Sequence, residues 1–138
     1  MARQAATLAA VSNEAVAREL WAAWERGDVA AMFELVDPEI VSRQFPEQAD
    51  VRDYHGHDGV REVMEDWIGT WEDWKIELLD VREVGDCALL SARQSGRGKS
   101  SGAAMDQPVW FVWLVRDGKV VSWQMFSSER EALEAAAG

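Results

Sequence analysis

The sequence predicts one α+β domain in which helices pack on one face of a curved antiparallel sheet. Three helix-like segments with one strand among them come first, four consecutive strand-like segments follow, and a short helix ends the chain. The length of 138 residues fits a single domain. We therefore expect the domain to occupy residues 12–138, behind an N-terminal extension of residues 1–11.

Helical periodicity predicts the three helices, because apolar residues recur at steps of three and four along each segment. The segments are 12–27, 28–36 and 58–71, and Ser12, Asp28 and Asp58 can serve as their caps. Asp37-Pro38 ends the second helix, since proline disfavours helical geometry in the residue before it. Residues 39–45 are then expected to form a short strand.

Apolar-rich runs bounded by turn residues predict the strands of the second half. The expected strands are 75–84, 87–94, 105–115 and 119–127, with a Gly/Ser-rich loop at 95–102. Asp117-Gly118 is a strong signal for a type I′ hairpin turn. Ser128 and Glu131 form a capping box that predicts a final helix over 129–136.

Residues 109–115 are apolar at every position, whereas a sheet with one face in water alternates with polar residues. Both faces of this strand are therefore expected to be covered. We predict a homodimer in which a partner chain covers the convex face of the sheet. The alternative is that the C-terminal helix or the N-terminal extension covers it.

Charge and composition exclude several classes of partner. The net charge of -11 repels phosphate backbones and anionic lipid, so neither nucleic acid nor a membrane is an expected partner. No apolar run approaches the length of a membrane span, and the first ten residues do not resemble a signal peptide. The only cysteine, Cys87, is expected to be a core residue in a protein of a reducing compartment, so we predict a cytoplasmic protein without a cofactor.

Several strings resemble the SnoaL-like branch of the nuclear transport factor 2-like superfamily, and together they span nearly the whole chain. They are ELWAAWERGD, DPEIV at 37–41, YHGHDGVREVMEDW at 54–67, GRG at 96–98, RDGKVVSW at 116–123 and EALEAAAG at the end. The resemblance implies a cone-shaped, cystatin-like fold in which three N-terminal helices wrap a curved antiparallel sheet. It also implies a pocket at the open end of the cone.

Enzymes of this superfamily include ketosteroid isomerases, polyketide cyclases, dehydratases and epoxide hydrolases, while other members only bind ligands or partners, so the fold does not choose a function. The resemblance implies an inward acid on the last or first strand. Here Met125 and Val41 stand at those places, and the first helix carries Trp21 and Trp24 rather than tyrosine. A ketosteroid isomerase mechanism is therefore poorly matched.

Two groups of polar residues are candidates for catalysis. His55 could act as a general base beside Tyr54, the only tyrosine, although a histidine at a helix entry is commonly structural. Arg93 and Asp106 could face the cavity as an anion-stabilising group and an acid or base, or they could form a surface salt bridge. Asp53, His55, His57 and Asp58 fall short of a zinc signature, so no metal is expected.

Eight tryptophans are many for this length, and they suggest flat aromatic walls around a planar ligand. The expected walls are Trp67 and Trp71 on the third helix and Trp110 and Trp123 on the sheet. Phe33, Val41 and Met125 are expected to complete the pocket. Trp21 and Trp24 are expected only to pack, and Trp113, on the other strand face from Trp110, is assigned to the dimer contact.

The leading functional hypothesis is the binding of a small, largely apolar or aromatic metabolite in this pocket, with catalysis left open. The first alternative is an isomerase, cyclase or dehydratase type of enzyme with His55 as general base. It requires His55 to point into the cavity. The second alternative is a protein interaction module with a residual cavity filled by side chains.

Overall fold

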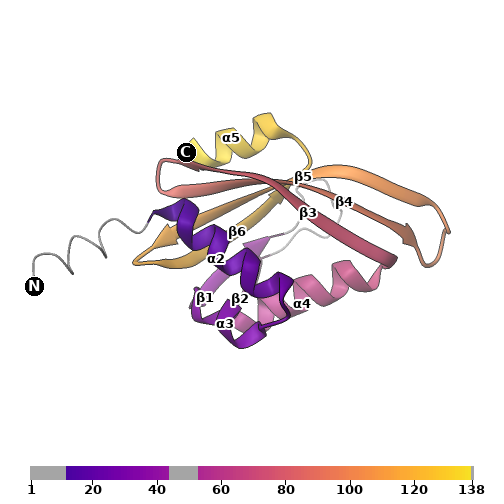
Figure 1. Ribbon diagram of the computed structural model, residues 1–138, viewed down its shortest axis with the longest axis horizontal. Helices are drawn as coiled ribbons and strands as arrows, with labels where there is room; N and C mark the ends of the chain where they lie inside the picture. The colour runs from indigo at the N-terminus through magenta and orange to yellow at the C-terminus, as the bar shows by residue number, and fades with distance from the viewer. Residues whose placement is uncertain (1–11, 44–52, 138) are drawn as a thin grey trace, which may run out of the picture.

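The computed structural model describes residues 12–43 and 53–137. Along the chain it contains α2 (Asn13–Glu25), α3 (Val29–Glu34), β1 (Val36–Arg43), β2 (Asp53–His55), α4 (Gly56–Gly69), β3 (Trp71–Val84), β4 (Cys87–Gly98), β5 (Ala104–Arg116), β6 (Lys119–Phe126) and α5 (Glu129–Ala137) (Figure 1). The predicted N-terminal extension and the end of the predicted strand 39–45 lie outside the described residues. None of the described helices is long and apolar enough to cross a bilayer.

The strands form one six-stranded sheet in the order β2-β1-β6-β5-β4-β3. Strand β1 runs parallel to β6, and every other neighbouring pair is antiparallel. The predicted α+β architecture is thus confirmed. Strand β2 was not predicted, because three residues are too few to show an alternating pattern.

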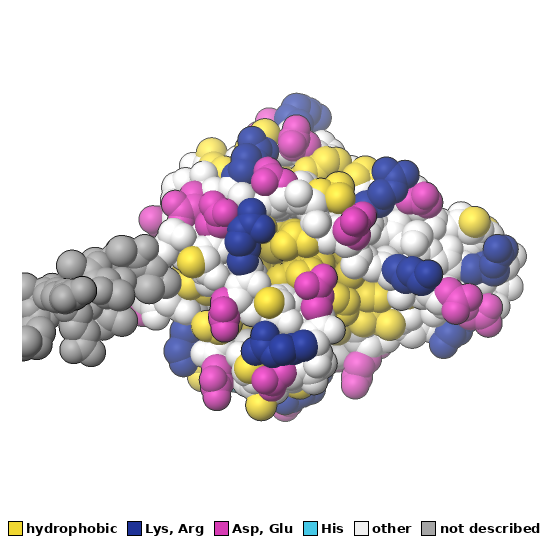
Figure 2. Space-filling model, in the orientation of Figure 1, with side chains coloured by type: hydrophobic (Ala, Val, Ile, Leu, Met, Phe, Trp, Pro, Cys, Tyr) yellow, Lys and Arg dark blue, Asp and Glu magenta, His cyan; other side chains and the backbone are white. Residues whose placement is uncertain are grey.

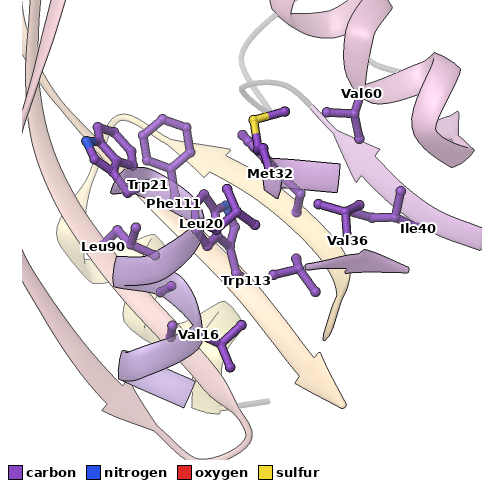
Figure 3. Close-up of a cluster of buried hydrophobic side chains, with 14 of the residues drawn as sticks. Val16, Leu20, Trp21, Met32, Val36, Ile40, Val60, Leu90, Phe111 and Trp113 are labelled. Atoms are coloured by element: carbon purple, nitrogen blue, oxygen red, sulfur yellow. The ribbon is translucent and has the colours of Figure 1, made fainter. Parts of the chain in front are cut away.

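Helices cover both faces of the sheet, so the expectation that they pack on one face only is wrong: α5 lies on the face opposite α2 and α4 (Figure 1). We call the face under α2, α3 and α4 the inner face and the face under α5 the outer face. Strand β5 alternates between them, with Val109, Phe111 and Trp113 in the inner core and Val112 in the outer one. Figure 3 shows α2 and the inner-face residues packed together. Since α5 covers part of the outer face, the C-terminal helix provides at least some of the cover that the apolar strand requires; the homodimer stays a prediction.

Two helix caps and one turn confirm the sequence analysis. The Ala15 N–H donates to Ser12 Oγ at 3.0 Å, and the Ala31 N–H donates to Asp28 Oδ1 at 3.1 Å. Asp117 and Gly118 have φ angles of 53° and 76°, and a type I′ turn requires positive φ at both positions.

The predicted cap of the third helix is wrong. His55 occupies the N-cap position without a side-chain hydrogen bond, and α4 begins at Gly56. Asp58 lies in the first turn, where its carboxylate interacts favourably with the positive end of the helix dipole. The carboxylate also accepts a hydrogen bond from Arg61 at 3.2 Å. A first-turn acid and an N-cap acid are close in sequence, so the pattern alone does not separate them.

Strand boundaries also differ from the prediction. Strand β1 begins at Val36, and Pro38 lies between Val36 and Val41, where the register with β6 shifts. Proline has no N–H to donate and is tolerated at such irregularities. Trp71 is the first residue of β3, paired with Gly98, rather than the last of α4. Strand β4 therefore runs through the first half of the predicted loop and ends at Gly98.

Candidate ligand-binding cavity

A cavity of about 60 Å³ lies between α2, α4 and the inner face of the sheet. Figure 2 shows hydrophobic surface in the middle of the face on which α2, α4 and β3 lie. The lining residues are Leu20, Trp21, Trp24, Val63, Met64, Trp67, Ile68, Trp74, Ile76, Gln94, Val109, Phe111, Trp113, Trp123 and Met125. This volume holds a few water molecules or part of a small organic ligand.

The lining side chains reach the cavity because of the two backbone periods. Leu20, Trp21 and Trp24 lie within one turn of α2, and α4 presents Val63, Met64 and Trp67 at the same spacing. On the sheet, every second residue points inward. The cavity lining thus draws large side chains from two helices, α2 and α4, and four strands, β3 to β6.

Aromatic rings form a connected network around the cavity. Trp21 meets Phe111 edge-to-face with ring centroids 5.8 Å apart, and Trp24 meets Trp74 at 5.9 Å. Trp113 and Trp123 lie 4.8 Å apart. Edge-to-face and tilted arrangements are favourable for aromatic pairs, so these contacts stabilise the rings as walls of the cavity.

Among the described lining residues, Gln94 alone has an amide side chain, while the others are aromatic, aliphatic or methionine; its exposed fraction is 2%. Its Oε1 accepts from Trp67 Nε1 at 2.9 Å and from Trp74 Nε1 at 3.1 Å. An indole N–H can only donate, so the amide oxygen must face the two tryptophans. The amide nitrogen, Nε2, is buried and has no hydrogen-bond partner among the described residues.

The described lining residues include no carboxyl, imidazole, thiol, ammonium or guanidinium group. General acid or base catalysis requires such a group within hydrogen-bond reach of the substrate. The cavity walls are therefore suited to apolar contact with a small number of oriented hydrogen-bond donors.

The family model described as the SnoaL-like domain matches residues 17–123, which is most of the chain. The chain belongs to the SnoaL-like domain family. The resemblance inferred from the sequence strings is thereby confirmed. A comparison with curated proteins finds no match.

Solved structures show the same nuclear transport factor 2-like fold. An NTF2-like protein from Burkholderia thailandensis has 26% sequence identity and a TM-score of 0.75, over 91% of this chain and 96% of that one. TerC, crystallized with polyporic acid, has 16% identity and a TM-score of 0.68, over 88% and 98%. A putative SnoaL-like polyketide cyclase from Jannaschia has 18% identity and a TM-score of 0.62, over 81% and 80%.

In this SnoaL-like domain, three of the predicted pocket residues line the cavity: Trp67, Trp123 and Met125. Trp71 lies outside the lining and packs edge-to-face on Trp67 at 5.4 Å. The expectation that Trp110 lines the pocket beside Trp123 is wrong, because Trp110 pairs with Phe126 and joins the outer cluster. A shift of one residue in strand phase reverses which face a side chain takes.

The assignment of Trp113 to the dimer contact is wrong for the same reason. Trp113 is fully buried on the inner face and lines the cavity. Trp21 and Trp24, expected only to pack, line it as well. Sequence analysis missed Trp74 and Gln94. The sequence did carry a signal for Gln94. It is the one polar residue in the alternating series Leu90, Ala92 and Gln94, whose side chains all point to the inner face.

Phe33 and Val41 do not line the cavity. Phe33 is a buried residue of α3. Its ring centroid lies 4.7 Å from the centroid of the His57 ring, and the Arg61 guanidinium lies 4.4 Å from the Phe33 centroid. Val41 lies on β1 beside a surface depression shared with Leu114 of the outer cluster. The prediction that Phe33 and Val41 complete the pocket is therefore wrong.

His55 and Tyr54 also lie outside the cavity lining. His55 is exposed at the N-cap of α4. Tyr54 is buried in the inner core, where a Cβ on Gly59 would lie 2.9 Å from the Tyr54 carbonyl carbon. The glycine is required because helix α4 passes this close to β2.

Arg93 and Asp106 form the surface salt bridge that was one of their two sequence interpretations. Arg93 Nε donates to Asp106 Oδ1 at 2.7 Å, and the side chains are 56% and 59% exposed. Arg93 points outward because its neighbour Gln94 points inward. An ion pair this exposed contributes little to stability.

The described residues contain no group of three His, Cys, Asp or Glu side chains placed to hold a metal ion. Asp53 pairs with Arg43, and His57 Nε2 donates to the Val36 carbonyl at 2.8 Å. Cys87 is buried in the outer cluster, where burial and then the nearby Asp86 carboxylate raise the pKa of its thiol. We therefore expect low reactivity, because the neutral thiol is a poor nucleophile.

Proposed function

We propose that this SnoaL-like protein binds a small, largely apolar or aromatic molecule in the cavity between α2, α4 and the sheet. The observation that carries the proposal is the lining itself, in which six of the eight tryptophans surround unfilled space. Apolar walls with a few oriented polar groups are the usual form of a small-molecule site. The fold neighbour TerC, crystallized with polyporic acid, supports the use of this architecture for ligands.

The enzyme alternative with His55 as general base receives no support from the geometry. His55, Tyr54, Arg93 and Asp106 all lie outside the lining. A base outside hydrogen-bond reach of the cavity cannot take a proton from a molecule bound there. Binding without proton transfer by these residues is the simpler function for this site.

The interaction-module alternative requires a cone filled by side chains and an exposed apolar patch. The cavity is instead unfilled. Among the described residues, Val29 and Leu79 are the only large hydrophobic side chains that are strongly exposed, and they come from α3 and β3. Two such residues do not mark an interface, because scattered exposed apolar side chains are normal.

Indole N–H signals in ¹⁵N-¹H NMR spectra test the proposal directly. Ethylbenzene, naphthalene and fluorene form a size series, and we expect saturable shifts of the signals from cavity tryptophans such as Trp67 and Trp123. The Trp110 signal is the internal control, because this ring faces the outer side. At about 0.3 kcal/mol per ligand heavy atom, fluorene should bind with a Kd of about 1 mM or tighter.

A matched pair of variants on α4 places the ligand. Ile68 lines the cavity and Glu65 is exposed on the same helix, so Ile68→Trp should abolish the shifts and Glu65→Trp should preserve them. Absence of any saturable shift in the wild-type protein would overturn the proposed function. Equal binding by both variants would move the site away from this cavity.

A further inference from the structure

The unpaired polar atoms of the cavity lining share one property: all of them are hydrogen-bond donors. Among the described lining residues, the buried side-chain nitrogens without a partner are Gln94 Nε2 and the Nε1 atoms of Trp21, Trp113 and Trp123. A buried donor without an acceptor carries a desolvation penalty. A bound molecule that supplies an acceptor relieves part of this penalty.

Gln94 is the best placed of these donors, because its orientation is fixed. Trp67 and Trp74 hold the amide oxygen from two sides, and an amide rotated by half a turn would place N–H groups against indole N–H groups. The nitrogen is thereby kept on the side away from both indoles. A donor that is held in position before binding loses little conformational entropy when a ligand arrives.

We propose that Gln94 makes the cavity selective for apolar molecules that carry an uncharged carbonyl oxygen, as in aromatic ketones and aldehydes. This inference rests on the proposed function and names the ligand class for the same site. The carbonyl oxygen accepts from Gln94 Nε2 while the aromatic part of the ligand contacts the tryptophan walls.

Carboxylates and alcohols fit the site less well than carbonyls. The described lining offers no cation to a carboxylate, which would lose its hydration without a partner inside a protein of net charge -11. An alcohol needs an acceptor for its own proton, and both indole N–H groups already occupy the Gln94 oxygen. A ketone or aldehyde accepts a hydrogen bond and brings no donor.

Four probes of similar size separate these chemistries: acetophenone, ethylbenzene, 1-phenylethanol and benzoate. Titration calorimetry and indole NMR shifts of the wild-type protein give their affinities. We expect acetophenone to bind about five- to ten-fold more tightly than ethylbenzene, which corresponds to one net neutral hydrogen bond. We expect 1-phenylethanol and benzoate to bind more weakly than acetophenone.

Gln94→Met removes the donor at nearly constant volume, and Gln124→Met is its control. Gln124 is half-buried and pairs with Val112 of the outer cluster, so it faces away from the cavity. The preference for acetophenone over ethylbenzene should fall to about one-fold in Gln94→Met and persist in Gln124→Met. If Gln94→Met does not fold, the side-chain NH₂ signals of wild-type Gln94 provide the test, since acetophenone should shift them and ethylbenzene should not.

The outcomes separate the two proposals. Binding of all probes without preference for acetophenone would overturn the selectivity and leave the proposed function standing. A preference that persists in Gln94→Met, or Gln94 NH₂ signals that ignore acetophenone, would overturn the role of Gln94. Absence of binding by every probe would overturn both.

Discussion

Strand β5 is apolar on both faces, yet its two faces are covered in different ways. On the outer face, α5 presents the small side chains Ala132 and Ala136 to the sheet, and both are buried. On the inner face, α2 and α4 present tryptophans and other large side chains, and a cavity remains between them. Alanine lets a helix approach the sheet closely, whereas rigid rings in edge contact hold the layers apart.

The comparison shows that burial and close packing are separate properties. Val109 and Val112 are 1% and 4% exposed, so exposure alone does not distinguish the two faces. Only Val109 lies beside unfilled space. A site for a ligand thus forms where large aromatic residues are buried without filling the volume between them.

The largest effect that we expect comes from removing a ring on the inner face. Trp113→Ala should lower the free energy of unfolding by about 4 kcal/mol, because Trp113 is fully buried and packs against the rings of Trp21, Phe111 and Trp123. Trp110→Ala, on the half-buried outer position, should cost about half as much or less. Urea denaturation of both variants measures the difference, and equal losses would contradict the distinction between the faces.

One added methylene on each face should change stability in opposite directions. Val109→Ile extends into the cavity and should be neutral or stabilising by about 0.5 kcal/mol, as cavity-filling substitutions commonly are. Val112→Ile crowds the close-packed outer cluster and should be destabilising by about 1 kcal/mol. The shift of the urea midpoint in each variant gives the sign of its change in stability. Shifts of the same sign in both variants would mean that the outer face is not more closely packed than the inner face.

The smallest effect that we expect is a change of stability with pH at the Cys87 thiol, which is buried in the outer cluster. Burial and Asp86 raise its pKa above the ordinary value of 9.0. An unfolded chain therefore loses this proton at a lower pH than the folded chain, so the stabilising contribution is present below pH 9 and is lost as pH rises through the folded pKa. Unfolding free energies at pH 8 and pH 10 should decline more in the wild type than in Cys87→Ala.

Reactivity gives an independent measure of the same thiol. Native Cys87 should be alkylated by iodoacetamide at pH 8 much more slowly than the urea-unfolded chain, since the neutral and buried form is a poor nucleophile. Equal rates in the native and unfolded states would show that α5 does not protect the outer cluster.

Local chemistry in the sequence determined the elements that were predicted correctly. Ser12 and Asp28 cap their helices as their side chains allow, and Asp117-Gly118 takes the turn that positive φ angles permit. The strings resembling SnoaL-like proteins identified the family. Trp67 was placed at the cavity by the helical period of its segment, whereas Met125 was placed by the family resemblance and Trp123 by sharing a strand face with it; all three line the cavity.

The tertiary structure alone decided the phase of the strands and the contents of the site. Residues 109–115 are apolar throughout, so their pattern does not say whether Trp110 or Trp113 faces the helices; pairing with β6 decides it. Gln94 gained its meaning only when Trp67 and Trp74, 27 and 20 residues away, were folded against its oxygen. A sequence records local periods and caps, whereas a cavity depends on how distant side chains fill, or fail to fill, the volume between layers.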